Sequence, residues 1–335
     1  MSSKVVQNRI NEFKNKGYIH EENFYCQGLV ESIKLQFDKD FLAKKKRFFR
    51  RFNDDSSKIR ANHDKNRWNM LLESNSDFVG SEFYAKPIIF DLLQEVFDGD
   101  FSLVFLSSDI SSPGSSFQTI HQDGNEFAVA LNLPLVESNE HNGSTQVFPF
   151  THRTSSDSYF SRLPNSFTDA EVIERVSEIS PLHLNLKKGD FTIRDLRLIH
   201  RGTPNHSDID RPYLSAVFLP VNDKEMPTFE VIEEGLRTFM EFKDVAFSSG
   251  RIELIDYANT FGRLVMVNAM SDRIARPIPK NISDGLSVNA RYCLRFAKFE
   301  DDTLNHSIKR TSEGSEILLK AIIDARLEFE ALKSQ

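Results

Sequence analysis

Over the first hundred residues, apolar side chains recur with a helical period of about 3.6 residues. In the first stretch they fall at Val6, Ile10 and Phe13, and Gly17 follows as a stop. The same pattern predicts helices over residues 4–15, 22–49 and 81–97. The second predicted helix ends in a basic run, residues 44–52. Such a run is typical of a solvated helix end. The alternatives are an anion-facing lip over a site and a localisation or nucleic-acid patch.

From residue 101 the period changes from 3.6 to two, which is the period of half-buried strands. Strands are predicted over residues 101–110, 117–123, 126–136, 144–150, 182–186, 190–194 and 212–219. Residues 151–166 are typical of a loop, and residues 167–177 of a short helix. Short strands separated by turns over roughly 120 residues favour a sandwich or a barrel.

After residue 220 the helical period returns. Helices are predicted over residues 230–242, 252–270 and 313–332, and one more strand over the alternating residues 291–299. We expect one domain over residues 1–335. It would comprise a helical part (1–100), a β core (101–225) and a helical extension (226–335).

Composition and charge exclude several classes of protein. Hydrophobic residues make up 39% of the chain and charged residues 27%, as in ordinary globular proteins. The net charge of −7 argues against a general nucleic-acid binder. Two cysteines indicate a reducing, cytoplasmic compartment, and we find no apolar run that predicts a secretory signal or a membrane span.

The candidate chemistry begins with the triplet His121-Gln122-Asp123. In an extended strand, residues two apart point to the same face, so this imidazole and carboxylate would project together. With 9 histidines and 49 acidic residues, about one such triplet is expected by chance, and alone it is better explained as an ordinary surface or core histidine.

Three further residues strengthen this candidate site. His200 follows the turn at Gly189 and supplies a possible third ligand. Two histidines and one carboxylate on one face of a metal are typical of non-haem Fe(II) oxygenases. Arg211 opens a predicted core strand, where a guanidinium needs a carboxylate or phosphate partner. Gln118 lies in the same segment as the H-x-D pair and offers donors for a second oxygen group.

These segments resemble the phytanoyl-CoA dioxygenase family of Fe(II)- and 2-oxoglutarate-dependent oxygenases. The matching motifs are P-G-S-S-F-Q-T-I-H-Q-D (113–123), N-G-S-T-Q-V-F-P-F-T-H-R (142–153) and G-D-F…H-R-G-T-P-N…R (189–211). Phe150-Thr151 and Tyr213 depart from the usual family pattern, but neither departure removes a ligand.

The resemblance implies a mainly β fold, a double-stranded β-helix (jelly roll, cupin-like) decorated by N- and C-terminal α-helices. It implies iron held by His121, Asp123 and His200, and 2-oxoglutarate held by Arg211 with help from Gln118 and Thr145. The implied reaction consumes O2 and 2-oxoglutarate and releases succinate and CO2. It oxidises an unactivated C–H bond of a small molecule, by hydroxylation, desaturation or cyclisation, in specialised metabolism.

Two alternatives remain open: a catalytically silent jelly-roll binding protein and a metal-dependent, cupin-like isomerase. The basic run favours an acidic substrate, and Arg194 and Arg197 would reach it unless they lie on the surface, which we consider the better interpretation. For the other core-flanking histidines we expect surface or structural roles: His141, His152, His183 and His206.

Overall fold

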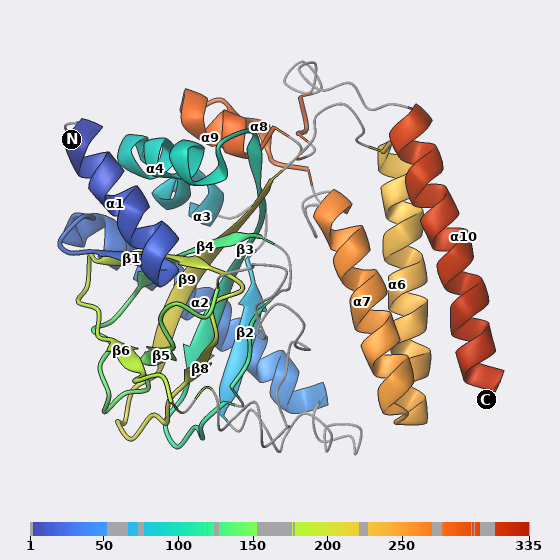
Figure 1. Cartoon of the computed structure of the whole chain (residues 1–335), viewed down its shortest axis with the longest axis horizontal. Helices are drawn as coiled ribbons and strands as arrows, with labels where there is room; N and C mark the ends of the chain where they lie inside the picture. Colours follow the sequence, from blue (N-terminus) through green and yellow to red (C-terminus); the bar gives the residue numbers. More distant parts are fainter. Residues whose placement is uncertain are drawn as a thin grey trace.

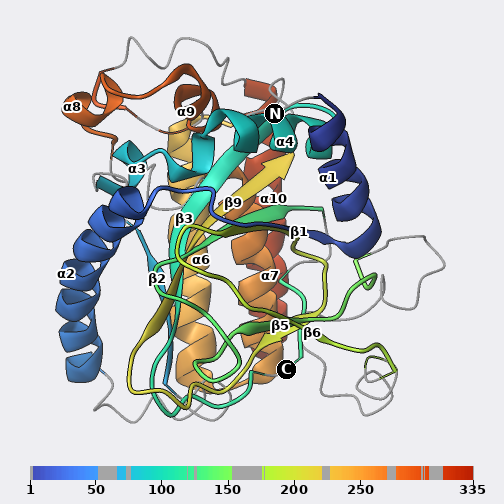
Figure 2. The ribbon, with the colours of Figure 1, turned by 90° about the vertical axis from the view of Figure 1, so that its left-hand side faces the viewer.

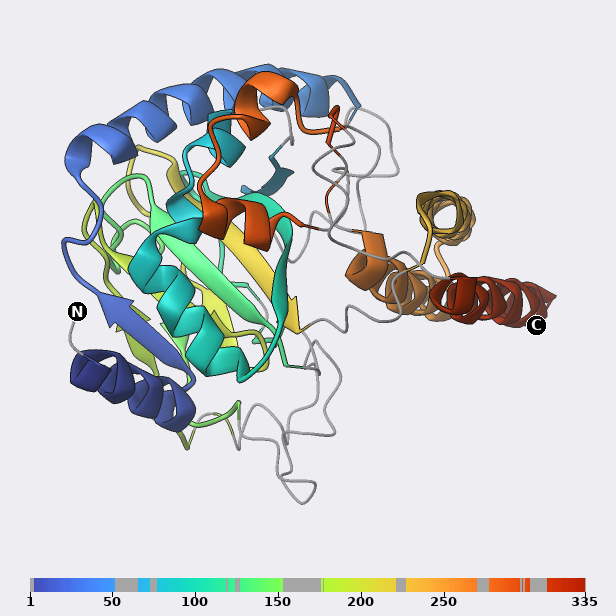
Figure 3. The ribbon, with the colours of Figure 1, turned by 90° about the horizontal axis from the view of Figure 1, so that it is seen from above.

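The protein is described here from a computed structural model. The structure describes residues 3–51, 66–72, 77–118, 120–123, 127–152, 176, 178–220, 227–269, 277–295, 297, 299–301 and 312–334. Figure 1 shows a β body with helices against it and a second group of helices at its side. Figure 3 shows from above that α6 and α10 of this second group lie to one side of the β body.

The larger sheet has six antiparallel strands in the order β1-β7-β4-β9-β3-β2. Its strands are β1 (Tyr18–Glu21), β2 (Arg67–Leu71), β3 (Phe101–Ser111), β4 (Val129–Pro134), β7 (Phe191–Asp195) and β9 (Arg211–Pro220). The smaller sheet has the order β6-β5-β8. Its strands are β5 (Thr145–Val147), β6 (Leu182–Leu184) and β8 (His200–Gly202). These two sheets, with their flanking helices, confirm the predicted jelly-roll fold.

The two faces of the larger sheet differ in chemistry, as β9 illustrates. Leu214, Ala216 and Phe218 alternate toward the main hydrophobic core. Arg211 and Tyr213 fall on the opposite face and line a cavity between the two sheets. The alternation therefore separates a packing face from a functional face along one strand.

The packing face is covered by the N-terminal helices α1 (Ser3–Lys16), α2 (Gln27–Arg51) and α4 (Pro87–Phe97). Ile10, Phe37 and Leu92 of these helices belong to the same buried core as the sheet. In Figure 2, α1 lies at the right and α2 at the left of the view, with α4 and short helices toward the top. The short helices are α3 (Asp77–Gly80), η2 (Phe83–Ala85), α8 (Lys280–Ser283) and α9 (Val288–Cys293).

The C-terminal helices α6 (Phe229–Ser249), α7 (Ile252–Ala269) and α10 (Ser312–Ser334) bury a core of their own. Phe242 of α6 stacks on Phe329 of α10 with ring centroids 4.1 Å apart. The long helices of both ends were thus predicted correctly, whereas a single domain over 1–335 remains a prediction.

Two strand predictions are wrong. Between residues 117 and 123 the described residues form no strand, and only His121 makes an isolated bridge, with His200. Its partner strand β8 is three residues long and forms its ladder with β5. The described residues of 291–299 also form no strand: residues 291–293 belong to α9, which Ser287 caps by accepting a hydrogen bond from the Ala290 amide, and Phe299 makes only an isolated bridge with Ile278.

Three short strands, β1, β2 and β8, were not predicted, and residues 22–26 precede rather than open α2. The predicted loop at 151–166, apart from residues 151 and 152, lies outside the described residues. So does the predicted helix at 167–177, apart from residue 176. In the basic run 44–52, the backbone is described as helix through Arg51, but the side chains are not.

Candidate active site

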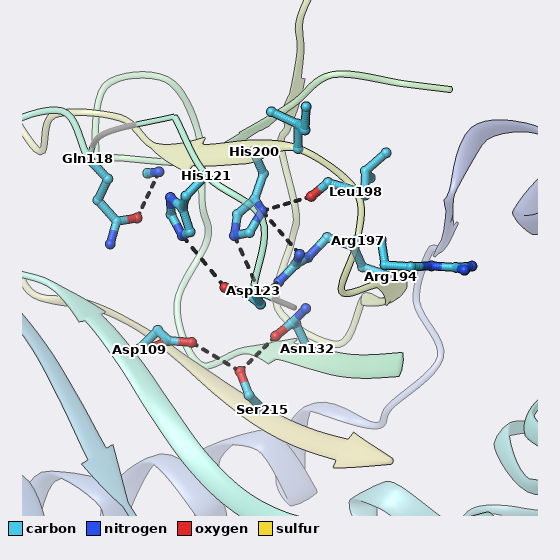
Figure 4. A network of polar contacts seen from close by, with 12 residues as sticks. Asp109, Gln118, His121, Asp123, Asn132, Arg194, Arg197, Leu198, His200 and Ser215 are labelled. Atoms are coloured by element: carbon cyan, nitrogen blue, oxygen red, sulfur yellow. Dashed lines mark hydrogen bonds and ion pairs between the residues drawn. The ribbon is translucent and has the colours of Figure 1, made fainter. Parts of the chain in front are cut away.

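The H-x-D pair and the distal histidine converge although they do not share a regular strand. His121 and His200 exchange backbone hydrogen bonds of 3.0 and 2.8 Å. Asp123 Oδ1 lies 3.6 Å from His121 Nε2, and Asp123 Oδ2 lies 3.5 Å from His200 Nε2. One ligand atom from each of the three residues falls within 4.8 Å of the others. Figure 4 shows the three side chains pointing at one another, as a shared metal ion requires.

The surroundings of His200 fix how it can bind a metal. Its Nδ1 lies 3.0 Å from the Leu198 carbonyl oxygen, so Nδ1 donates its hydrogen there and the Nε2 lone pair faces Asp123. Burial, reinforced by the positive charge of Arg194, holds the pKa of His200 well below its usual range. The imidazole is therefore neutral at neutral pH, the state in which it binds metal.

Arg194 stands behind the triad rather than on the surface, contrary to the sequence-based expectation. It belongs to β7, all five of whose residues are buried. Its Nη2 donates to Asp123 Oδ2 at 2.5 Å and its Nη1 lies 3.2 Å from His200 Nδ1. Burial opposes ionisation of Asp123, but its interactions with His200, Arg194 and His121 outweigh that effect and hold the pKa of Asp123 well below its usual range. Asp123 is thus a carboxylate, as a metal ligand must be.

Arg211 is a buried cation whose hydrogen-bonding capacity is incompletely used. Only 3% of it is exposed, and burial lowers its pKa. Nη2 donates to the Gly143 carbonyl oxygen at 2.6 Å, while Nε and Nη1 have no hydrogen-bond partner among the described residues. The guanidinium also lies 4.1 Å from the centre of the Tyr213 ring. Unsatisfied buried donors are rare, and here they fit the planar carboxylate of a bound anion.

Gln118 and Thr145 line the same cavity as Arg211 and the triad. Gln118 Oε1 accepts from the Gly202 amide at 2.9 Å, which leaves its NH2 group to donate. Gly202 has no room for a side chain, because a Cβ there would lie 2.6 Å from Gln118 Oε1. The structure thus brings all six predicted site residues to one cavity.

The cavity has a volume of about 170 Å³, room for on the order of ten water molecules. Several of its polar residues were not predicted from the sequence: Arg67, Asp109, Asn132 and Thr192. Arg67, from β2, donates through Nε to the Ser116 carbonyl oxygen at 3.1 Å and through Nη2 to the Thr203 carbonyl oxygen. The alternation of side chains along the strands could have indicated these residues, because they fall on the face of the sheet that also carries Arg211.

The remaining predicted residues lie apart from the triad. His152 is buried, with Nε2 3.3 Å from the Lys14 carbonyl oxygen, and His183 contacts Ser144 and Gln146 of the smaller sheet. Arg197 pairs with Asp195 at 2.7 Å. These contacts are structural, as expected for the two histidines.

Comparison with known families agrees with this geometry. Residues 13–213, more than half of the chain, match the family model described as phytanoyl-CoA dioxygenase (PhyH). The chain therefore belongs to this family, and it is an Fe(II)- and 2-oxoglutarate-dependent oxygenase. The predicted family, enzyme class and cofactors are confirmed.

Solved structures with a similar arrangement include three enzyme complexes. The epimerase SnoN with Fe3+, alpha ketoglutarate and nogalamycin RO is 17% identical, over 65% of this chain and 84% of its own, with a TM-score of 0.46. EctD from S. alaskensis with 2-oxoglutarate and 5-hydroxyectoine is 16% identical over 66% and 77%, with a TM-score of 0.49. HygX from Streptomyces hygroscopicus with nickel, 2-oxoglutarate and hygromycin B is 12% identical over 64% and 87%, with a TM-score of 0.48. The functional assignment rests on the family match.

The helices within the described ranges were also compared with the length and apolarity that a membrane span requires. None of them is both long and apolar enough to cross a bilayer.

Proposed function

We propose that His121, Asp123 and His200 hold the iron, and that this centre oxidises an unactivated C–H bond of a small molecule. The support is the donor set itself: two imidazoles and one carboxylate, gathered in one cavity. This set leaves the opposite side of a metal open for other ligands. Arg194 holds Asp123 and contacts His200, and such outer contacts orient metal ligands.

Arg211 binds the far carboxylate of 2-oxoglutarate in this proposal. Its Nε and Nη1 donors have no hydrogen-bond partner among the described residues, and its charge is buried. A guanidinium can bind a carboxylate through two parallel hydrogen bonds, so such an anion would satisfy these donors. Gln118 donates its amide NH2 to the same cosubstrate, and Thr145 contributes its hydroxyl from the facing sheet. The observation that carries the proposal is this one cavity, with a metal-binding triad and a buried arginine whose two donors are unsatisfied.

When bound, iron and 2-oxoglutarate supply an oxidant from O2, with succinate and CO2 as the by-products. The chain's own residues position the substrate and enclose the site. The two sheets enclose the site so that one C–H bond of the substrate is held near the metal. Asp123 fills a metal position that a chloride ion would need, so oxidation rather than halogenation is expected.

The substrate is a small molecule that enters the cavity. A role in specialised metabolism, by hydroxylation, desaturation or cyclisation, stays a prediction. An acidic substrate also stays a prediction, because the side chains of the basic run lie outside the described residues. The cytoplasm is our proposed location, supported by two free cysteines, Cys26 and Cys293.

The test is uncoupled turnover without substrate. Protein is incubated with Fe(II), ascorbate, 2-oxoglutarate and O2, and succinate is measured. We expect succinate from the wild type, none from His200→Ala, and wild-type amounts from His141→Ala, whose exposed histidine lies outside the cavity. Failure of the wild type both to bind iron and to form succinate would refute the proposal, as would turnover that proceeds without O2.

A further inference from the structure

Tyr213 lies beside Arg211 in the cavity. Both residues belong to β9, and because they are two positions apart they point to the same side of the sheet and line the cavity. The guanidinium carbon of Arg211 lies 4.1 Å from the centre of the Tyr213 ring. Tyr213 is also a position at which the sequence departs from the usual family pattern, so membership of the family gives it no role. Its role has to follow from its contacts.

The ring stabilises the charge of Arg211 without occupying its hydrogen-bond donors. Arg211 is only 3% exposed, yet Nε and Nη1 have no hydrogen-bond partner in the described part of the chain. The electron-rich face of an aromatic ring attracts a cation but takes none of its N–H groups, whereas a paired carboxylate side chain would take them. The donors of Arg211 therefore stay available to a ligand although the charge is buried.

The other charged residues of the cavity do not fix the orientation of this guanidinium. Arg67 donates to two backbone carbonyl oxygens, and Arg194 donates to the carboxylate of the triad. Burial lowers the pKa of Arg211, and the charge of Asp109 offsets only part of that effect. The one hydrogen bond that Arg211 donates within the described residues goes to the Gly143 carbonyl oxygen. The neighbouring tyrosine ring is therefore the second directed contact that holds the guanidinium.

The Tyr213 ring is itself held in place. Only 5% of the residue is exposed, and its hydroxyl donates to Ser138 Oγ at 2.5 Å. The backbone of Ser138 is fixed in turn by two hydrogen bonds with Leu186, of 2.7 and 2.8 Å. The ring also packs in a buried cluster that includes Val147 and Leu184. It can therefore move away from the guanidinium only by breaking these contacts.

The turn that follows Ser138 holds the guanidinium as well. Nη2 of Arg211 donates to the Gly143 carbonyl oxygen at 2.6 Å. The Asn142 side chain braces the turn by donating to the Glu137 carbonyl oxygen, also at 2.6 Å. The hydroxyl of the ring and the guanidinium beside it are thus anchored to one turn.

We propose that Tyr213 is a positioning residue that holds the Arg211 guanidinium ready for the far carboxylate of 2-oxoglutarate. This inference rests on the proposed function, because it presumes that Arg211 binds the cosubstrate. A side chain that is already ordered loses less freedom when its ligand binds, so the affinity is higher. A merely structural tyrosine would instead stabilise the cavity as a whole, the metal site included.

The experiment measures two affinities by calorimetry: that of 2-oxoglutarate for Ni(II)-loaded protein, and that of Ni(II) for metal-free protein. Tyr213→Leu removes the ring but stays apolar, whereas Tyr213→Phe keeps the ring and loses the bond to Ser138. Arg211→Met shows the full loss of the anchor. Tyr292→Leu is the matched control, because Tyr292 makes the same contact with Arg295, at 4.1 Å, outside the cavity.

We expect Tyr213→Leu to weaken 2-oxoglutarate binding about tenfold, and Tyr213→Phe and Tyr292→Leu to weaken it less than about threefold. The Kd for Ni(II) should change less than about threefold in these tyrosine variants, because the proposed metal ligands are left unchanged. Rescue by phenylalanine assigns the effect to the ring, and an unchanged Ni(II) affinity excludes general damage to the cavity. If Tyr213→Leu does not fold, Tyr213→Met replaces it.

Three results would overturn the inference while leaving the proposed function intact. They are wild-type affinity for 2-oxoglutarate in Tyr213→Leu while Arg211→Met loses it, equal losses in Tyr213→Phe and Tyr213→Leu, and a matching loss of Ni(II) affinity in Tyr213→Leu. Failure of both ring-free variants to fold would also overturn it, because the ring would then be structural. If wild-type protein does not bind Ni(II) and 2-oxoglutarate, or if Arg211→Met binds 2-oxoglutarate as tightly as wild type, the proposed function itself fails and the inference fails with it.

Discussion

Replacing Arg211 by methionine tests whether this side chain binds 2-oxoglutarate or stabilises the fold. The guanidinium is buried, donates one hydrogen bond to the Gly143 carbonyl oxygen, and leaves Nε and Nη1 unsatisfied. Losing the bond to Gly143 costs about 1–2 kcal/mol, and removing a buried charge returns about as much or more. The free energy of unfolding of the ligand-free protein should therefore stay unchanged or rise by about 1 kcal/mol.

The effect on ligand binding is much larger. Removing one partner of a buried ion pair costs about 3–5 kcal/mol, which weakens 2-oxoglutarate binding by roughly two to three and a half powers of ten. At a concentration one hundred times the wild-type Kd, 2-oxoglutarate stabilises wild-type protein by about 2.7 kcal/mol. At the same concentration the stabilisation of Arg211→Met falls below about 0.4 kcal/mol.

The assay is thermal unfolding of Ni(II)-loaded protein with and without 2-oxoglutarate. Arg237→Met is the matched control, because Arg237 is an exposed residue of α6 that pairs with Glu234 on its own helix. We expect the ligand-induced shift in Tm to vanish in Arg211→Met and to persist in Arg237→Met. An undiminished shift in Arg211→Met, or a loss of more than about 3 kcal/mol in the ligand-free protein, would refute the reasoning.

Two further predictions concern a glycine and the cysteines. Gly202→Ala forces a Cβ against Arg67 Nη1 and to within 2.6 Å of Gln118 Oε1, both side chains of the cavity. We therefore expect a KM for 2-oxoglutarate raised about tenfold or more, and no change from Gly28→Ala, where a Cβ meets nothing within 4 Å. Equal KM values in these variants would show that Gln118 is remote from the cosubstrate. Iodoacetamide should add once to the folded protein, at exposed Cys26, because burial raises the pKa of the Cys293 thiol to about 12; two adducts before unfolding would contradict this.

The candidate site could be predicted from the sequence because its ligands carry distinctive chemistry. His121, Asp123, His200 and Arg211 stand out by residue type and spacing, whatever the exact backbone path. The assumed strand at 117–123 is wrong, yet the pair still converges with His200, because their backbones pair at a single bridge. The prediction of the metal ligands therefore holds although the strand that was used to explain it does not form.

The residues around the ligands could not be predicted in the same way. Arg194 interrupts a buried strand pattern, and its partner Asp123 lies 71 residues away in the sequence. Asp109 comes to the cavity wall through pairing of β3 with β9, a register that no local pattern fixes. The same limit applies to β1, a four-residue strand that is defined only by its partner β7.

The proposed function requires one cavity to hold iron and 2-oxoglutarate side by side. A crystal structure of the protein grown without O2, with Fe(II) and 2-oxoglutarate present, tests it most directly. We predict an iron ion, located by its anomalous signal, bonded to Nε2 of His121, Nε2 of His200 and one oxygen of Asp123. The far carboxylate of 2-oxoglutarate should pair with the Arg211 guanidinium. Iron bound elsewhere, or 2-oxoglutarate bound away from Arg211, would contradict the claim.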